Sequence, residues 1–252
     1  MTWVQTCTAA LLVSLRLAPT LAMAQPFTLI RLPVVLRLLL ALAFALWSVD
    51  ARPERTARRM AGRDVVGMMV GELAVGLSIA LTLQLAFAAI AWAGRVLDVQ
   101  AGFGLAALAD PTTREELPLA GTILVYGGGM IFFATGAQYD LLALWLASIE
   151  TLPLGFGMLR PDIIALGTFL GSVFLLAVGL VGAALLAIFL ADIVIALMAR
   201  TLPQMNILLL GFQVKAMLLI VTLPIALSVS GALFLRIFTL SLAAPAQWWF
   251  RP

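Results

Sequence analysis

A chain of 252 residues could form one large soluble domain or two small ones, but 63% of its residues are hydrophobic and only 11% are charged, against about 25% charged residues in soluble domains. This composition excludes the soluble, disordered and fibrous classes and predicts a protein surrounded by lipid or by other protein. The absence of histidine excludes His-based catalysis, metal ligation and proton relays, and the single Cys7 excludes an intramolecular disulfide.

The first apolar run, Trp3–Ala24, has some features of a signal peptide. It ends in a small-residue sequence that resembles a cleavage site. The first seven residues carry no basic side chain, however, and Arg16 and Pro19 interrupt the apolar centre that a signal peptide requires. We therefore predict that this run is retained as a first helix.

Apolar runs that could cross a membrane recur along the whole chain. A spanning helix needs about 20 apolar residues, within a range of about 17 to 25. Val34–Val49 is marginal, and Leu141–Ile149 is far too short, which indicates an interfacial or packed helix. We predict an all-α polytopic membrane protein with about six long apolar helices in hairpins, at Trp3–Ala24, Val34–Val49, Val65–Ala93, Leu117–Ala137, Ile163–Met198 and Ile207–Leu235.

The connection Asp50–Asp64 contains five arginines. Basic residues concentrate in the cytoplasmic loops of membrane proteins, so this loop indicates topology rather than nucleic-acid binding. Counting hairpins from an inside position places residues 94–117 outside, and residues 138–162 and the C-terminus inside. The residues that define this prediction are Arg52, Arg55, Arg58, Arg59 and Arg63.

Residues 102–118 do not continue the apolar pattern. Two glycines and an Asp110-Pro111 turn interrupt the segment, which also carries three acidic residues and an arginine. Irregular polar backbone between apolar helices occurs in water, buried in protein, or lining an aqueous cavity. On its residues alone the segment is either an ordinary external loop or part of such a cavity.

Charged and polar residues also interrupt the apolar runs. A charge near the centre of a membrane raises the free energy of helix insertion by roughly 2.5–3.5 kcal/mol. Asp192 and Lys215 lie at matching depths on the two arms of the last hairpin, whose turn is Arg200–Asn206. Pro203 ends the first arm and Asn206 is an N-cap for the second. The two charges either pair across the hairpin or are satisfied separately. The other interruptions are Arg16, Glu72, Gln84 and Arg236.

Glycine spacing indicates where helices pack closely. Gly67-x-x-x-Gly71 and Gly167-x-x-x-Gly171 have the small-residue spacing that allows close helix approach. Three adjacent glycines at residues 127–129 predict a kink or a tight backbone contact, because each weakens a helix by about 1 kcal/mol relative to alanine. No Gly-Lys-Ser/Thr sequence follows them, so nucleotide binding has no support.

Two stretches carry a recognisable pattern. Residues 71–111 form a Gly-Glu-led helix that runs to a glutamine, a glycine-rich turn and Asp-Pro, and residues 200–215 contain Pro-Gln-x-Asn followed by Gly-Phe and Lys. In this order they resemble the flagellar biosynthetic FliR family and its type III secretion counterparts, the SctT proteins. The matching positions are Gly71, Glu72, Gln84, Ala86, Phe87, Gln100, Gly102, Asp110, Pro111, Pro203, Gln204, Asn206, Gly211, Phe212 and Lys215.

The resemblance implies a non-enzymatic structural subunit without cofactors, in a type III protein export gate at the flagellar basal body of the bacterial inner membrane. Such a subunit belongs to a tilted helical assembly with FliP and FliQ homologues and a FlhB homologue. It would contact membrane lipid and unfolded export substrates but no nucleic acid. Residues 1–162 would be akin to FliP, and residues 163–252 to the FliQ hairpin, within one membrane domain.

The resemblance also implies roles for individual residues. Family members place the loop after the Gln-Gly turn in the pore as a plug, which here falls within residues 103–118. The plug and its hinge would comprise Gly102, Phe103, Gly104, Leu105, Leu108, Asp110 and Pro111. The residues expected to support structure and assembly are Glu72, Gln84, Gln100, Asp192, Pro203, Gln204, Asn206, Gly211 and Lys215.

Other classes of protein fit the sequence less well. A secondary transporter would show a repeated half with broken helices at matching positions, whereas the breaks near residues 110 and 155 are not equivalent. A membrane enzyme would need a convergent polar cluster, and the polar residues here are dispersed. An injectisome subunit remains the alternative to a flagellar one, followed by a small-solute transporter.

Overall fold

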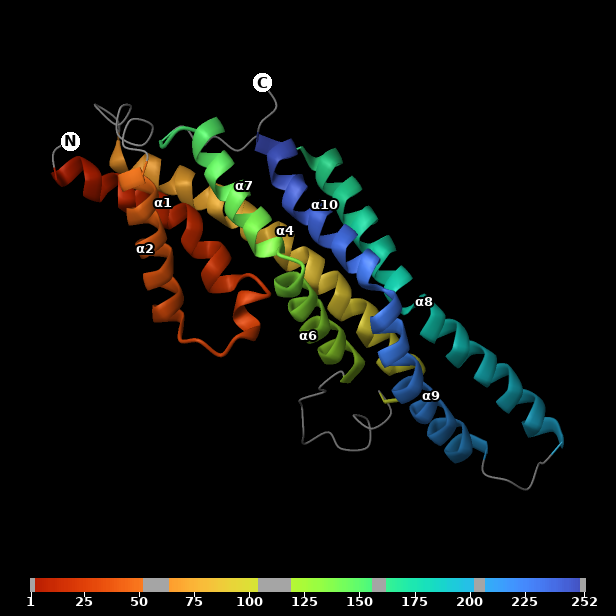
Figure 1. Cartoon of the computed structure of the whole chain (residues 1–252). Coiled ribbons are helices and arrows are strands. Elements are labelled where there is room, and N and C mark those ends of the chain that lie inside the picture. The colour runs from red at the N-terminus through yellow and green to blue at the C-terminus, as the bar shows by residue number, and fades with distance from the viewer. Residues whose placement is uncertain (1–2, 52–63, 104–118, 156–161, 202–206, 250–252) are drawn as a thin grey trace. The chain divides into compact units, whose positions relative to one another are not determined.

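The computed structural model describes residues 3–51, 64–103, 119–155, 162–201 and 207–249 (Figure 1). These residues form α-helices and one short 3-10 helix, η1, and no strand occurs among them. The predicted all-α fold is confirmed. The elements are α1 (Trp3–Met23), η1 (Phe27–Leu29), α2 (Val34–Ala51), α4 (Val65–Gln100), α6 (Leu119–Ala134), α7 (Ala137–Thr151), α8 (Ile163–Thr201), α9 (Ile207–Val229) and α10 (Gly231–Trp249).

Within the described residues, five helices are long and apolar enough to cross a membrane: α1, α2, α4, α8 and α9. A sixth span is formed if α6 and α7, which meet at a bend of 70°, are counted together. At about 1.5 Å per residue, the 36 residues of α4 and the 39 of α8 extend about 54 and 58 Å. Because a bilayer core is only about 30 Å thick, these two helices must tilt or project beyond it.

Two of the predicted apolar runs divide in the structure. The run Leu117–Ala137 was expected to span by itself, but α6 ends at Ala134, and Gly136 turns the chain into α7 with φ of 79°. The last run, Ile207–Leu235, was expected to be one helix and instead breaks at Ser230, between α9 and α10. Serine and glycine are weak helix formers, and the buried Ser230 hydroxyl donates to the Leu180 carbonyl oxygen at 3.4 Å.

The closest helix approaches occur at glycines other than those in the two predicted motifs. A Cβ on Gly167 or Gly171 would meet no heavy atom within 4 Å. At Gly76 it would overlap the backbone of Arg16, and at Gly94 the backbone of Gly121. Within the described chain, the Gly167-x-x-x-Gly171 motif therefore does not mark a close approach of helices, whereas the Gly67-x-x-x-Gly71 motif stays a prediction.

The glycines at residues 127–129 do not interrupt the helix, because α6 continues through them. A Cβ on Gly127 would lie 2.9 Å from the Leu227 side chain, and one on Gly128 would lie 3.1 Å from Phe234. The missing side chains therefore make room for large side chains from α9 and α10. This is the tight-contact alternative, with side chains rather than backbone as the neighbours.

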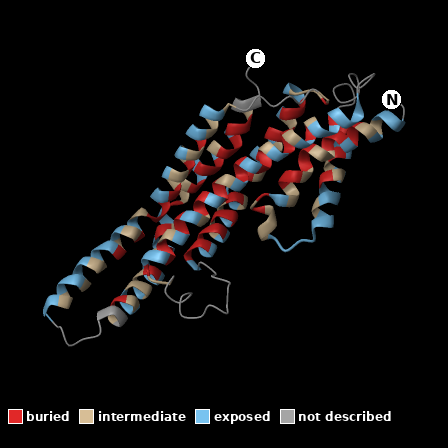
Figure 2. Ribbon diagram, turned by 180° about the vertical axis from the view of Figure 1, so that it is seen from behind, coloured by how far each residue is buried: buried red, intermediate tan, exposed pale blue. Residues whose placement is uncertain are grey.

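The chain divides into two compact units that are each discontinuous in sequence. The first comprises Met1–Ala86, Phe132–Gly171 and Phe238–Pro252, and the second comprises Phe87–Ile131 and Ser172–Ile237. In the first unit, α1 and α2 lie side by side and are joined through η1 (Figure 1). In the second, buried side chains line α4, α6 and the adjoining part of α8, whereas α8 has no buried residue from Phe189 to Thr201 (Figure 2).

Candidate functional site

An ion pair lies at the centre of the first unit. Arg16, on α1, donates from Nε to Oε2 of Glu72, on α4, at 2.6 Å, and both side chains are completely buried. The two helices can meet this closely because Gly76, one turn after Glu72, has no side chain and lies against the Arg16 backbone. Both charged residues interrupt apolar runs, but the sequence did not indicate that they would pair.

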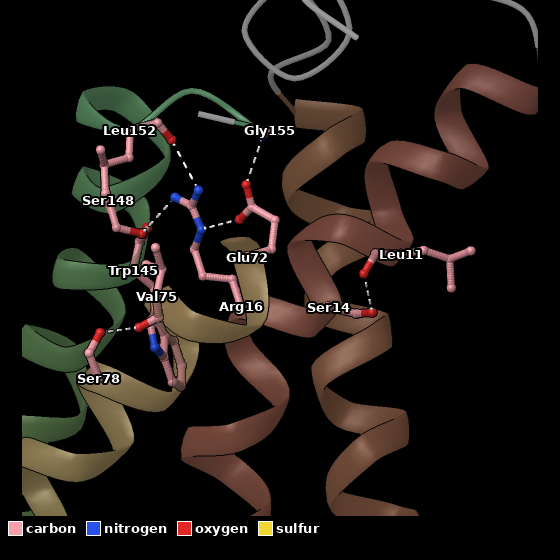
Figure 3. A network of polar contacts seen from close by, with 10 residues as sticks. All are labelled: Leu11, Ser14, Arg16, Glu72, Val75, Ser78, Trp145, Ser148, Leu152 and Gly155. Carbon is pink, nitrogen blue, oxygen red and sulfur yellow. Dashed lines mark hydrogen bonds and ion pairs between the residues drawn. The ribbon is translucent and has the colours of Figure 1, made fainter. Parts of the chain in front are cut away.

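The remaining polar atoms of this pair are also satisfied (Figure 3). Nη1 of Arg16 donates to the Ser148 hydroxyl at 3.2 Å, and Nη2 donates to the Leu152 carbonyl oxygen at 3.0 Å. The second oxygen of Glu72 accepts from the backbone N–H of Gly155 at 2.9 Å. The guanidinium and the carboxylate together therefore join α1, α4, the end of α7 and the turn that follows it.

The turn after α7 is shaped by Gly155, whose φ is +80°. A Cβ there would also lie 2.6 Å from Sδ of Met68. Only glycine fits both the backbone conformation and the space, which allows its N–H to reach Glu72. The predicted role of Glu72 in structure therefore has a physical basis, although a role in assembly stays a prediction.

In the second unit, the ends of α4 and α6 are held together by Asp98. One carboxylate oxygen of this buried residue accepts from the backbone N–H of Ala120 at 2.9 Å, and the other accepts from that of Gly121 at 3.2 Å. The first turn of a helix has unpaired N–H groups that such a carboxylate satisfies. Asp98 therefore caps α6 from a neighbouring helix, a role that its position in the sequence did not reveal.

The chain is anchored at both ends of the predicted plug segment. At its start, Gly102 adopts a φ of +90°, and the ring of Phe103, the first residue of the segment, meets Phe212 of α9 edge-on, with centroids 6.0 Å apart. After it, Ala120 and Gly121 are bound to Asp98. The other predicted plug residues, Gly104, Leu105, Leu108, Asp110 and Pro111, lie outside the described residues.

The final hairpin contains an ion pair between the two charged residues whose pairing the sequence left undecided. Lys215 Nζ, on α9, contacts Oδ1 of Asp192, on α8, and the two side chains are 21% and 39% exposed. Nearby, Gly211 packs against Ile195. Of the two alternatives for these charges, the structure shows pairing across the hairpin. Pro203, Gln204 and Asn206, predicted to form its turn, lie outside the described residues.

The other predicted residues are dispersed. The side-chain oxygen of Gln84 accepts from the backbone N–H of Gln25 at 3.2 Å, and Gln100 is exposed at the end of α4. Among the described residues, no three or more Asp, Glu, Cys or His side chains are grouped so that they could hold a metal ion. The arginines predicted to define topology, Arg52, Arg55, Arg58, Arg59 and Arg63, lie outside the described residues.

The model of the family described as bacterial export proteins, family 1, matches residues 7–241. The chain belongs to this family. It is 26% identical to the flagellar biosynthetic protein FliR of Escherichia coli over 66% of this chain and 61% of that protein. It is 26% identical to FliR of Bacillus subtilis over 68% of each chain, and 25% identical to the secretion system apparatus protein SsaT of Salmonella typhimurium over 66% of this chain and 65% of that one.

The matches cover only part of the length of each of these relatives. The chain spans less than two thirds of the length of the E. coli FliR protein. The matched region of the family model nevertheless includes Arg16, Glu72, Asp98, Asp192 and Lys215. The Arg16–Glu72 pair, the Asp98 cap and the Asp192–Lys215 pair therefore all lie in the part of the chain that the family model matches.

We expect the Arg16–Glu72 pair to be required for a stable fold. Glu72→Leu should lower the free energy of unfolding by about 3–5 kcal/mol, because it leaves a buried guanidinium without its counter-charge. The double variant Arg16→Met with Glu72→Leu removes both charges and should lose less than the single variant. Unfolding of the purified chain in mixed detergent–SDS micelles measures both, and a double variant less stable than Glu72→Leu alone would contradict the pairing argument.

Proposed function

We propose that this member of the export family is a non-catalytic subunit of a type III protein export apparatus in the bacterial inner membrane. It would form part of the conduit through which unfolded export substrates pass. The observation that carries the proposal is the family match over residues 7–241. The apolar spans agree with a membrane location, and the charged side chains of the described contacts pair with one another or with backbone groups rather than converging on an open site.

We assign the chain to a flagellar apparatus at the basal body. Two of the three relatives described above are named flagellar biosynthetic proteins, and the third is named a secretion system apparatus protein. Because the identities differ by only one percentage point, an injectisome subunit is the second candidate. The two candidates share the same physical role and differ in which filament or needle their substrates build.

The partners we propose are FliP, FliQ and FlhB homologues. Residues 1–162 would occupy a FliP-like position and residues 163–252 a FliQ-like one. The α8–α9 hairpin supports a protein-facing role for the C-terminal part, because α8 has no buried residue from Phe189 to Thr201 and the hairpin carries a partly exposed ion pair. An ion pair of this kind is poorly suited to lipid.

Residues 103–118 would act as a plug that seals the conduit at rest. The contacts of Asp98 with α6 and of Phe103 with α9 support this, because they anchor the chain at both ends of the segment. Movement needed to admit a passing chain would then be confined to the segment itself. Leu105 and Leu108 would exclude water and ions from the closed state.

The function is tested by deleting the gene in its bacterium. We expect loss of protein export and of the filament or needle, with recovery on expression of the intact chain. Native mass measurement of the tagged chain after mild extraction should identify FliP and FliQ homologues with it. Normal export in the deletion strain, or a solitary working monomer, would overturn the proposal, whereas the type of structure lost distinguishes the flagellar from the injectisome form.

We expect removal of Leu105–Leu117 to leave the complex assembled but permeable to small ions. The deletion begins after the anchored residues Gly102 and Phe103 and stops before α6, so the helix contacts should persist. Ion leakage is measured as membrane conductance in cells that carry the variant, and co-purification of the partners verifies assembly. An assembled complex with unchanged conductance would count against the plug.

Lys215→Glu should weaken assembly through the final hairpin. The substitution places a second acidic side chain beside Asp192, and like charges in an apolar environment repel strongly. The exchanged pair, Asp192→Lys with Lys215→Glu, restores opposite charges and serves as the matched control. The measurement is the amount of each partner recovered with the tagged chain. Full recovery for the single variant would show that the pair has no role in assembly.

A further inference from the structure

The second helix has an unusually uniform outer surface. Of its residues, only Ala41, Ala45, Ser48 and Val49 are buried within the chain. From Leu38 to Val49 the helix carries no charged side chain. The exposed positions in this stretch are apolar throughout, and we call them the outer face of α2: Leu38, Leu39, Leu40, Ala43, Leu46 and Trp47. Their larger side chains are 43% to 57% exposed.

The distribution of small residues around α2 separates its two sides. Helices in membranes meet other helices through small residues, which allow the backbones to approach. In α2 the buried side supplies these residues, namely Ala41, Ala45 and Ser48, and α2 packs beside α1 (Figure 1). Apart from Ala43, the outer face presents long leucines and a tryptophan. Such a surface suits flexible acyl chains better than a closely packed helix.

A comparison with α8 and α9 shows that low burial within the chain does not decide whether a helix surface faces lipid or another protein. The spans of α2 and α9 are equally little buried, at 22% each. However, α9 and α8 expose part of the Lys215–Asp192 ion pair, and α8 has glycines at residues 167, 171 and 182 with open space beside them. These features favour a protein neighbour. The outer face of α2 has neither feature.

The length and ends of α2 also match a bilayer. Its 18 residues extend about 27 Å, close to the thickness of about 30 Å of the hydrocarbon core. At the start of the helix, the Arg37 guanidinium donates to the carbonyl oxygen of Leu32, in the α1–α2 connection, and to that of Ala22, in the last turn of α1. Near the other end lie Trp47 and the exposed Asp50, and tryptophan is enriched at membrane interfaces.

We propose that the outer face of α2 lies against the acyl chains of membrane lipid in the assembled protein and is not covered by another subunit. In this arrangement α2 anchors the first unit in the bilayer, whereas its small-residue side holds α1. The inference rests on the surface of α2 and not on the proposed function, so the two can be tested independently.

The test uses nitroxide labels on the full chain in lipid nanodiscs, together with the proteins that co-purify with it. Cys7→Ser removes the native thiol, and Leu39→Cys and Leu46→Cys place one label at a time on the outer face. We expect oxygen, which concentrates in lipid, to relax each label several times more effectively than a water-soluble nickel chelate. Two positions keep the test valid if one variant does not fold, which gel filtration checks.

Two reference positions on the same helix calibrate the measurement. Asp50→Cys, at the exposed polar end, should be more accessible to the nickel chelate, and Leu42→Cys, on a partly buried side, should be less accessible to oxygen than Leu39→Cys. A label at Leu39 or Leu46 that is immobile and shielded from both reagents would show a protein neighbour. Strong relaxation by nickel would show water, and either result would overturn the proposal.

Discussion

A charge buried among apolar helices must meet its counter-charge, and this constraint organises the first unit. Arg16 and Glu72 are both fully buried, and their remaining polar atoms bind Ser148, Leu152 and the backbone of Gly155. Contacts between leucine- and alanine-rich helices are weakly directional, because many registers bury a similar apolar area. The guanidinium makes three directed hydrogen bonds and the carboxylate accepts one more from Gly155, so far fewer registers satisfy the pair.

The same principle recurs at lower burial in the second unit. Asp98 is nearly buried and satisfies the first N–H groups of α6, whereas the Lys215–Asp192 pair is partly exposed on the final hairpin. These three contacts use charged side chains to hold helix ends, turns and arms in place. In each of them the charged groups hold parts of the chain together that are distant in the sequence or lie on different helices.

The helices differ in the surroundings for which their surfaces are suited. Helix α2 is as long as a bilayer core is thick and presents an apolar outer face, whereas α4 and α8 are much longer than that core. From Phe189 to Thr201, α8 has no buried residue. Asp192 in this part of α8 forms a partly exposed ion pair with Lys215 of α9. These differences underlie our proposals that α2 faces lipid and that the hairpin faces neighbouring subunits.

The membrane class, the all-α fold, most helix positions and the family could be read from the sequence, because hydropathy and motif spacing are properties of consecutive residues. The possible pairing of Asp192 with Lys215 was visible for the same reason, since a short turn joins their helices. The contact of Arg16 with Glu72, the capping of α6 by Asp98, the close approaches at Gly76 and Gly94, and the break at Ser230 were not visible. Only the tertiary structure decided them, because each depends on which helix faces meet in space.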